Sequence, residues 1–270
     1  MTQARAYAEV IGDPIDHSKS PRIHGFWIAE AGIDADYRAT RVTRAELPDF
    51  LARRRADPHW RGCNVTMPLK LDALMLADEA TDRATTAGAA NLLAPRDGLL
   101  MAANTDVGAV ANLLAPIVKD APPGITLLGN GGAARAILVA LRLLGAPGVR
   151  IQARDLTAAT KLAVEFGLDE GPVAFDQPIV TGGLINSTPL GMKGHPPVAL
   201  DIDGMPDDGW VFDVVTDPVE TELLRRARLR GLNTLDGIHM LVEQAATSFE
   251  LFFGQPPPRE RDAELLETLR

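Results

Sequence analysis

The feature that most constrains the fold of this chain is a regular alternation of apolar runs and helical segments through its second half. Short apolar runs such as ITLLG, VRIQAR, GGLINST and GWVFDVV are typical of buried strands. Longer segments with apolar residues at helical spacing stand between them, for example GGAARAILVALRLLG and VETELLRRARLRG. Strands separated by helices in this way favour a parallel sheet flanked by helices. We therefore predict an α/β fold whose parallel sheet occupies residues 106–237.

The first part of the chain has a different rhythm. AYAEVIGD, ADYRATRV and GCNVT have strand character, and NLLAPRDGLLMAA predicts a hairpin that turns at Arg96-Asp97-Gly98. Helices are predicted after Pro21, with Ser20 as N-cap, from Glu46 to Arg55, and from Pro68 onward. A long helix over 237–253 and a final amphipathic helix end the chain. Residues 1–105 are thus predicted to form a separate α/β domain.

Composition limits the classes of partner. The net charge of −9 argues against nucleic acid or an anionic membrane as the partner. One cysteine, Cys63, allows neither an internal disulfide framework nor a cysteine-cluster metal site. No run approaches the roughly 20 apolar residues of a membrane span, and the first residues have no apolar signal core. We expect a cytoplasmic protein whose partners are small molecules.

A glycine loop follows the first strand of the parallel sheet. Gly129, Gly131 and Ala134 fill the G-x-G-x-x-G/A pattern between an apolar strand and a helix. Small residues let the backbone turn tightly and approach a pyrophosphate at the positive N-terminus of the helix. An ordinary glycine-rich turn has the same spacing, but the strand–turn–helix context favours a dinucleotide. The sequence predicts a Rossmann-like dinucleotide-binding domain.

The end of the next strand, QARD, bears on which nicotinamide cofactor binds. An acidic residue there favours the free ribose hydroxyl of NAD, whereas an arginine accommodates the 2′-phosphate of NADP. Arg154 and Asp155 are both present. Because Asp155 is also well placed to cap the next helix, we predict NADP, with NAD as the alternative.

Lysine is rare in this chain, which raises the question of why one ends the stretch NVTMPLK. By direct count the lysines are five among 27 cationic residues. An ammonium group can exchange a proton at working pH and a guanidinium cannot, so Lys70 invites a chemical interpretation. A solvated lysine on a helix is the simpler alternative. A lysine and a carboxylate beside a nicotinamide would form a proton-transfer pair.

Two further polar clusters lie in the first part. Ser18 and Ser20 precede a helix, where hydroxyls and free N–H groups suit a carboxylate, although an N-cap serine with an incidental neighbour fits equally. AANTDVGA places Asp106 just before a helix, where an N-cap role is again the alternative.

The motifs SKSP, NVTMPLK, AGAANLL, NTD, GNGGAARA, INSTPLGM, FDVV and DGIHMLVEQAA occur in this order. With them the chain resembles the shikimate dehydrogenase family almost from end to end. The resemblance implies NADP-dependent reduction of 3-dehydroshikimate to shikimate in aromatic amino acid biosynthesis, without a metal, by a monomer or homodimer. It also implies that residues 238–270 complete the substrate-binding domain of residues 1–105, and that 106–237 form the inserted NADP-binding domain.

The resemblance implies a role for each matching residue. Lys70 and Asp106 would be the catalytic pair. The substrate would be held by Ser18, Ser20, Thr66, Asn91, Asp106 and Gln244. The cofactor would be held by Gly129, Asn130, Gly131, Gly132, Ala133, Arg154, Asp155, Thr188, Val214, Gly237 and Asp82.

The chain also departs from the family pattern. Thr216 stands where the family has a substrate-holding tyrosine, and Ala158 stands where a second arginine of the adenosine site is usual. Val107 replaces a glycine that often follows Asn-Thr-Asp. These changes leave open a quinate/shikimate or other cyclohexane-carboxylate dehydrogenase using NAD. A catalytically silent binding paralogue and a two-domain NADP enzyme acting on folate derivatives are further alternatives.

Overall fold

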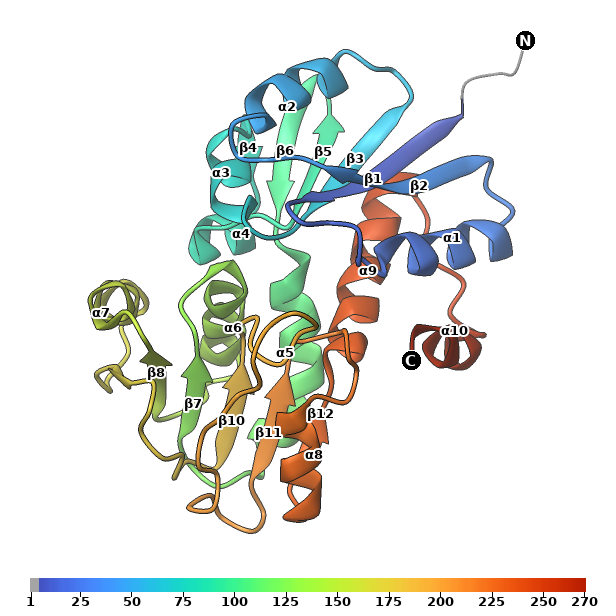
Figure 1. The fold of residues 1–270 in the computed structure, drawn as a ribbon. Coiled ribbons are helices and arrows are strands. Elements are labelled where there is room, and N and C mark those ends of the chain that lie inside the picture. The colour runs from blue at the N-terminus through green and yellow to red at the C-terminus, as the bar shows by residue number, and fades with distance from the viewer. Residues whose placement is uncertain (1–4) are drawn as a thin grey trace. The chain divides into compact units, whose positions relative to one another are not determined.

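The computed structural model describes residues 5–270 and divides into two compact units (Figure 1). The first unit comprises the described chain up to Asp106 together with Val242–Arg270, and the second is Val107–Leu241. Both boundaries fall inside helices, α5 (Thr105–Val118) and α9 (Gly237–Phe253). Each unit contains one six-stranded sheet, so the predicted α/β class is confirmed.

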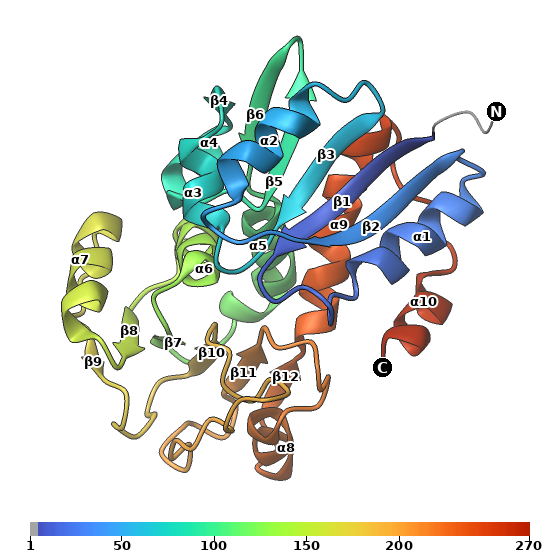
Figure 2. The same ribbon diagram turned by 45° about the horizontal axis from the view of Figure 1, so that its top comes forward.

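The first unit has a mixed sheet in the order β2-β1-β3-β5-β6-β4 (Figure 2). β1 pairs in parallel with β2 and β3, β5 is antiparallel to β3 and β6, and β4 is parallel to β6. The predicted hairpin is confirmed, because Asp97 and Gly98, with φ of 52° and 83°, form the two-residue turn between β5 and β6. The strands are β1 (Ala6–Gly12), β2 (Ala35–Arg41), β3 (Trp60–Val65), β4 (Glu79–Ala80), β5 (Leu92–Arg96) and β6 (Leu99–Ala103).

Helices α1 (Ser20–Glu30), α2 (Leu47–Arg55), α3 (Lys70–Met75), α4 (Asp82–Ala87) and α10 (Asp262–Leu269) complete the unit. Two predicted helix starts are wrong. The N-cap of α1 is Lys19, and Ser20 is already its first helical residue. The helix predicted from Pro68 begins two residues later, at Lys70. α10 is anchored to α1, where the indole of Trp27 donates to Asp262 Oδ1 at 2.9 Å.

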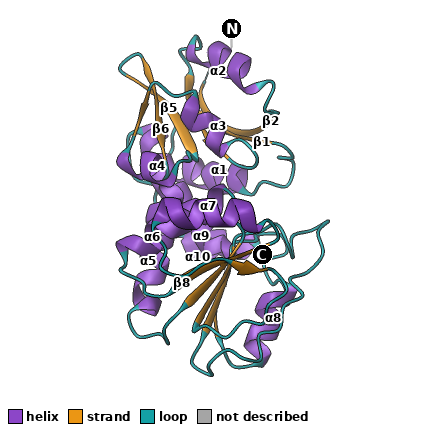
Figure 3. Ribbon diagram, turned by 90° about the vertical axis from the view of Figure 1, so that its left-hand side faces the viewer, coloured by secondary structure: helices purple, strands orange, loops and turns teal. Residues whose placement is uncertain are grey.

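The second unit has a sheet in which every pair is parallel, in the order β12-β11-β10-β7-β8-β9 (Figure 1). Figure 3 distinguishes the strands, in orange, from the helices, in purple. This confirms the predicted parallel sheet. The chain runs outward from β7 to one side and then from β10 to the other, so the strand order reverses between β7 and β10. In open α/β sheets ligands bind outside the carboxyl ends of the strands at such a point. The strands are β7 (Ile125–Leu128), β8 (Val149–Ala153), β9 (Val173–Ala174), β10 (Gly183–Asn186), β11 (Trp210–Asp213) and β12 (Asn233–Leu235).

Helices α6 (Gly132–Leu143), α7 (Leu156–Phe166) and α8 (Glu222–Leu229) flank this sheet. α6 buries its apolar side almost completely, whereas α8 turns only Leu223, Leu224 and Ala227 inward, as its arginine-rich sequence requires. Among residues 5–270, no helix has both the length and the apolar character to cross a membrane.

Candidate active site

Lys70 and Asp106 form an ion pair in the first unit. Lys70 opens α3, directly after the loop that follows β3, and its Nζ lies 2.5 Å from Asp106 Oδ2. The side chains are 16% and 6% exposed, so the pair is largely removed from water. Among the residues that the structure describes, Asp106 is the only acceptor assigned to Nζ. Two of the three ammonium hydrogens therefore remain available to a ligand.

Asp106 is held from its other side by Asn91. The Asn91 amide nitrogen donates to Asp106 Oδ1 and to Thr105 Oγ1, both at 2.8 Å, while its oxygen accepts from the Thr105 N–H at 2.7 Å. Asp106 is not the N-cap of α5, since Thr105 is the first helical residue and Asp106 lies in the first turn. A carboxylate in the first turn of a 14-residue helix is favoured by the helix dipole. Asp106 is thereby held in a fixed orientation toward Lys70.

α9 contributes a second amide to this cluster. Gln244 Oε1 lies 3.4 Å from the Thr105 hydroxyl and 3.5 Å from Asn91 Nδ2. One turn further along α9, Ser248 accepts from Asn64 Nδ2 at 2.8 Å. The structure thus brings together Lys70 and Asp106 with Asn91 and Gln244, two of the predicted substrate-binding residues.

The hydrogen bonds continue outward to an aromatic group. Tyr37 donates its phenolic hydrogen to Asn64 Oδ1 at 2.6 Å, which fixes the Asn64 amide with its nitrogen toward Ser248. The Tyr37 ring stacks on His24 with centroids 3.9 Å apart. Buried polar networks of this kind specify a unique arrangement when their members are satisfied.

The remaining predicted substrate residues lie at strand ends of the same unit. Thr66 directly follows β3 and donates its N–H to Ile11 O, at the end of β1. Ser18 Oγ accepts from the Ser20 N–H at 3.3 Å, which orders the turn before α1. Ser20 is buried and Ser18 half-buried. No hydrogen bond between either serine and the Lys70–Asp106 pair is assigned in the part of the chain that the structure describes.

In the second unit, the glycine turn connects β7 to α6. Gly129 has φ of +100°, a conformation that L side chains rarely adopt, and an added Cβ would lie 2.9 Å from Thr188 Cγ2. Gly131 is the N-cap of α6 and has open space where a Cβ would point. The first N–H groups of a helix lack partners within the helix and suit a phosphate. The residues present therefore fit a pyrophosphate between Gly129 and Ala133.

Three more predicted cofactor residues, Thr188, Val214 and Gly237, belong to this unit. An added Cβ at Gly237 would lie 2.3 Å from the carbonyl oxygen of Val214, so only glycine fits where α9 begins. Thr188 follows β10, and its N–H and hydroxyl both donate to Asn186 Oδ1. The end of β10, the end of β11 and the start of α9 thus place these residues at one edge of the sheet.

Arg154 and Asp155 follow β8 and have different surroundings. Asp155 is the N-cap of α7 and accepts from the Ala158 N–H at 2.9 Å, as its alternative interpretation predicted. Arg154 is exposed, with no ion pair among residues 5–270. Asp82, the first residue of α4, is exposed and belongs to the first unit.

Sequence reasoning missed several members of these clusters. Asn64 and Ser248 were not assigned to the site, nor were Asn186 and Asp213, which end β10 and β11. Each has a buried side chain, and the two strand-end residues carry no exposed surface at all. The available signal was a polar residue within an apolar run, as in GCNV, LIN and VFD.

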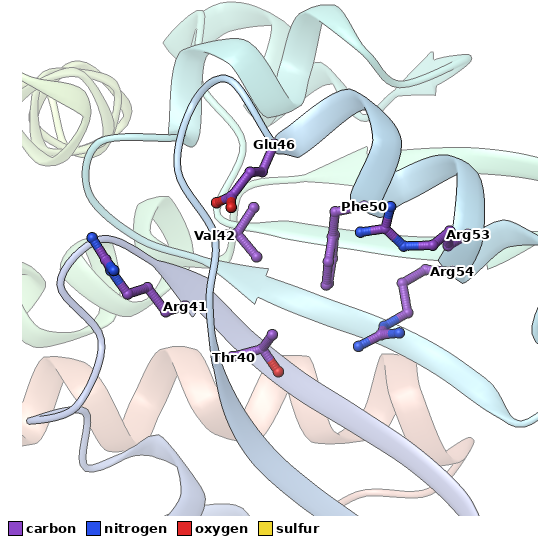
Figure 4. A pocket seen from close by; sticks show the side chains of 7 residues that line it. All are labelled: Thr40, Arg41, Val42, Glu46, Phe50, Arg53 and Arg54. Atoms are coloured by element: carbon purple, nitrogen blue, oxygen red, sulfur yellow. The ribbon is translucent and has the colours of Figure 1, made fainter.

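A separate cavity of about 210 Å³ lies between β2 and α2 (Figure 4). Two of its three arginines are paired, Arg54 with buried Glu9 at 2.6 Å and Arg41 with Asp13 at 2.7 Å, and the third, Arg53, is exposed. It contains none of the residues predicted for the site. Within the described residues, no group of three or more His, Cys, Asp or Glu side chains is arranged to hold a metal ion.

A largely buried lysine–aspartate pair at the starts of two helices in the first unit, and a glycine turn at the strand reversal of the second, are features of a two-domain, nicotinamide-dependent oxidoreductase. Residues 10–93 match the model of the shikimate dehydrogenase substrate binding domain, and residues 237–267 match that of the shikimate 5′-dehydrogenase C-terminal domain. The NADP-dependent shikimate dehydrogenase of Sphingopyxis alaskensis is 47% identical, covering 97% of this chain and 96% of that protein. The chain belongs to the shikimate dehydrogenase family.

Two solved structures are informative neighbours. Shikimate 5-dehydrogenase from Thermus thermophilus, in complex with NADP(H) and shikimate, is 32% identical with a TM-score of 0.87, covering 98% of this chain and 100% of that one. Quinate dehydrogenase from Corynebacterium glutamicum, in complex with NAD, is 30% identical with a TM-score of 0.84, covering 98% and 99%.

Proposed function

We propose that this protein catalyses the reversible, NADP-dependent reduction of 3-dehydroshikimate to shikimate in aromatic amino acid biosynthesis. The observation that carries the proposal is the Lys70–Asp106 pair, 2.5 Å long and largely buried, in a member of this family. Its 47% identical relative is named as an NADP-dependent shikimate dehydrogenase. The enzyme acts in the cytoplasm as a monomer or homodimer.

Lys70 is the general acid of the reduction and the general base of the reverse reaction. Its ammonium gives a proton to the C3 oxygen of the substrate, and the same amine takes it back when shikimate is oxidised. Such proton transfer typically contributes 10²–10⁴-fold to the rate. Asp106 orients the ammonium and stabilises its charge, and Asn91 holds Asp106 in place.

The cofactor supplies the hydride when it is bound. The backbone from Gly129 to Ala133 holds its pyrophosphate at the start of α6, and Thr188, Val214 and Gly237 line the same edge of the sheet. Arg154 receives the 2′-phosphate, because Asp155 is engaged as the cap of α7. Asp155 and Asp82 are also proposed to line the cofactor site.

The substrate is a small ring acid. Ser18 and Ser20 hold its carboxylate, while Thr66, Asn91 and Gln244 contact ring hydroxyls together with the pair. The Asn91 amide hydrogens already go to Asp106 and Thr105, so its contribution to the substrate is made chiefly through the Asp106 carboxylate that it orients. Thr216 leaves the family's tyrosine contact unfilled.

A quinate/shikimate dehydrogenase using NAD is the second candidate, favoured by Thr216 and by the similarity to the Corynebacterium quinate dehydrogenase. Steady-state rates with shikimate and quinate, each with NADP and NAD, separate the two. We expect the highest kcat/KM with shikimate and NADP. A large preference for quinate with NAD would replace the first proposal by the second. Shikimate binding without turnover with either cofactor would identify a silent binding protein, and turnover of a methylene-folate alone would indicate a folate enzyme.

A further inference from the structure

A fully buried carboxylate at the end of β11 has no part in the mechanism above. Asp213 accepts three hydrogen bonds, from Asn186 Nδ2 at 2.9 Å, from the Val215 N–H at 3.1 Å and from the Thr221 hydroxyl at 2.7 Å. Burial raises its pKa to about 6. A carboxylate is an acceptor-only group when ionised, so it matches three converging donors. Burying a polar group is costly unless its hydrogen bonds are made, and these three contacts hold the Asp213 side chain in one orientation.

The neighbouring Asn186 has its amide orientation fixed from both ends. Asn186 and Asp213 are paired residues at the last positions of the adjacent strands β10 and β11. The Asn186 nitrogen donates to Asp213 Oδ1 and to Leu190 O, at 2.9 and 3.0 Å. If the amide flipped, its oxygen would face two acceptors, which is unfavourable for a buried group.

This orientation determines where Thr188 lies. Asn186 Oδ1 accepts from the Thr188 hydroxyl at 2.7 Å and from its N–H at 3.1 Å. The Thr188 methyl group is thereby held against the glycine turn, 2.9 Å from where a Cβ of Gly129 would lie. The next residue back, Ser187, donates its hydroxyl to Leu128 O at 2.6 Å and joins β10 to the end of β7.

We propose that Asp213 and Asn186 are positioning residues for dinucleotide binding, which act by holding Thr188 against the Gly129 turn at the strand reversal. The carboxylate fixes the amide, and the amide fixes the threonine. This inference rests on the proposed cofactor role of the glycine turn and adds two residues that do not themselves touch the cofactor.

The test is direct titration of NADPH binding to the purified full-length chain, together with kcat and KM for shikimate at saturating NADP. Asp213→Ala removes all three acceptor contacts, and NADPH binding is expected to weaken by roughly tenfold, the effect of losing the one hydrogen bond that orients the Asn186 amide. Asp213→Asn keeps an oxygen toward Asn186 and a donor toward Thr221, so it should restore affinity to within about threefold of the wild type. KM for shikimate should stay within about twofold in both variants.

Thr221→Val is the matched control, because it removes the hydrogen bond on the opposite side of the same carboxylate. It should lower the melting temperature while leaving NADPH affinity unchanged. Equal affinity losses in Thr221→Val and Asp213→Ala, or wild-type affinity in a folded Asp213→Ala, would overturn the inference. If Asp213→Ala does not fold, Asn186→Ala must show the same roughly tenfold loss, and wild-type affinity there would also overturn it. A wild type that binds NADH and not NADPH would refute the proposed cofactor instead, and the same variants would then be compared with NADH.

Discussion

Replacing His24 by phenylalanine should remove a large part of the chain's loss of stability in acid. His24 lies on α1 and is completely buried, stacked on Tyr37 with an interplanar angle of 4°. Neither of its ring nitrogens has a hydrogen-bond partner among residues 5–270. Burial lowers the pKa of His24 from its ordinary 6.5 to about 3, because the imidazolium cannot be solvated there.

The magnitude follows from the difference between the folded and unfolded states. The unfolded chain binds a proton at this histidine as pH falls below 6.5, whereas the folded chain does so only near pH 3. Stability from this group is therefore fully present above pH 6.5 and is lost as pH falls. At 1.36 kcal/mol per pKa unit, the loss is about 2 kcal/mol at pH 5 and about 4 kcal/mol at pH 3, where the folded pKa is reached.

Asp213 acts in the opposite direction. Its pKa is raised from 3.8 to about 6 in the folded state, so the fold gains stability as pH falls between these values, by up to about 3 kcal/mol. The measured quantity must therefore be a difference between variant and wild type, in which the Asp213 contribution cancels.

The assay is urea unfolding at about pH 7.5 and about pH 5. Between these pH values, the free energy of unfolding of His24→Phe should fall by about 2 kcal/mol less than that of the wild type. His195→Ala, which removes an exposed histidine, should show the same change in free energy of unfolding between the two pH values as the wild type. An unchanged pH dependence in His24→Phe would refute the assignment of acid sensitivity to this buried ring.

Two other substitutions test the glycine turn and a buried ion pair. Gly129→Ala places a side chain at φ of +100° and against Thr188, so titration should show NADPH binding weakened by more than tenfold while shikimate binding persists. If the variant and the wild type bind NADPH equally well, the glycine turn is not part of the cofactor site. Glu9→Gln leaves the largely buried guanidinium of Arg54 without its charge partner, and urea unfolding should show a loss of about 3–5 kcal/mol, whereas the exposed Glu46→Gln should change little. If Glu9→Gln loses less than about 1 kcal/mol of unfolding free energy, the buried Glu9–Arg54 ion pair does not have the stabilising role given to it here.

Much of the fold could be predicted because local patterns and long-range packing agree. The alternation of apolar runs and helices identified β7, β8, β10 and β11, and the Asp97-Gly98 turn identified the β5–β6 hairpin. The strands β4, β9 and β12 have two or three residues each, too few to show a period. The start of α3 was misplaced because Pro68 is a favourable first helical residue, but the helix begins only at Lys70.

The site could be predicted only in part. Lys70 and Asp106 are 36 positions apart, and their 2.5 Å contact depends on β3 and β6 both being antiparallel to β5, which lies between them, so that both end at the same edge of the sheet. Local pattern favoured capping roles for Ser20 and Asp106 that the structure does not show, whereas it located the Asp155 cap correctly. The hydrogen bonds that Asn64, Asn186 and Asp213 make could be identified only from the folded structure. The sequence shows that a polar residue lies in an apolar run, but not which residue it will contact.

The central claim is that Lys70 transfers the proton, and the most direct measurement is kcat of Lys70→Ala beside its dissociation constant for shikimate. We predict that kcat falls by roughly 10³-fold or more while the dissociation constant changes only a few-fold. Lys161→Ala, an exposed lysine of the second unit, should keep both values. A folded Lys70→Ala enzyme that retains kcat within tenfold of the wild type, or that loses shikimate binding in proportion to its rate, would contradict the account.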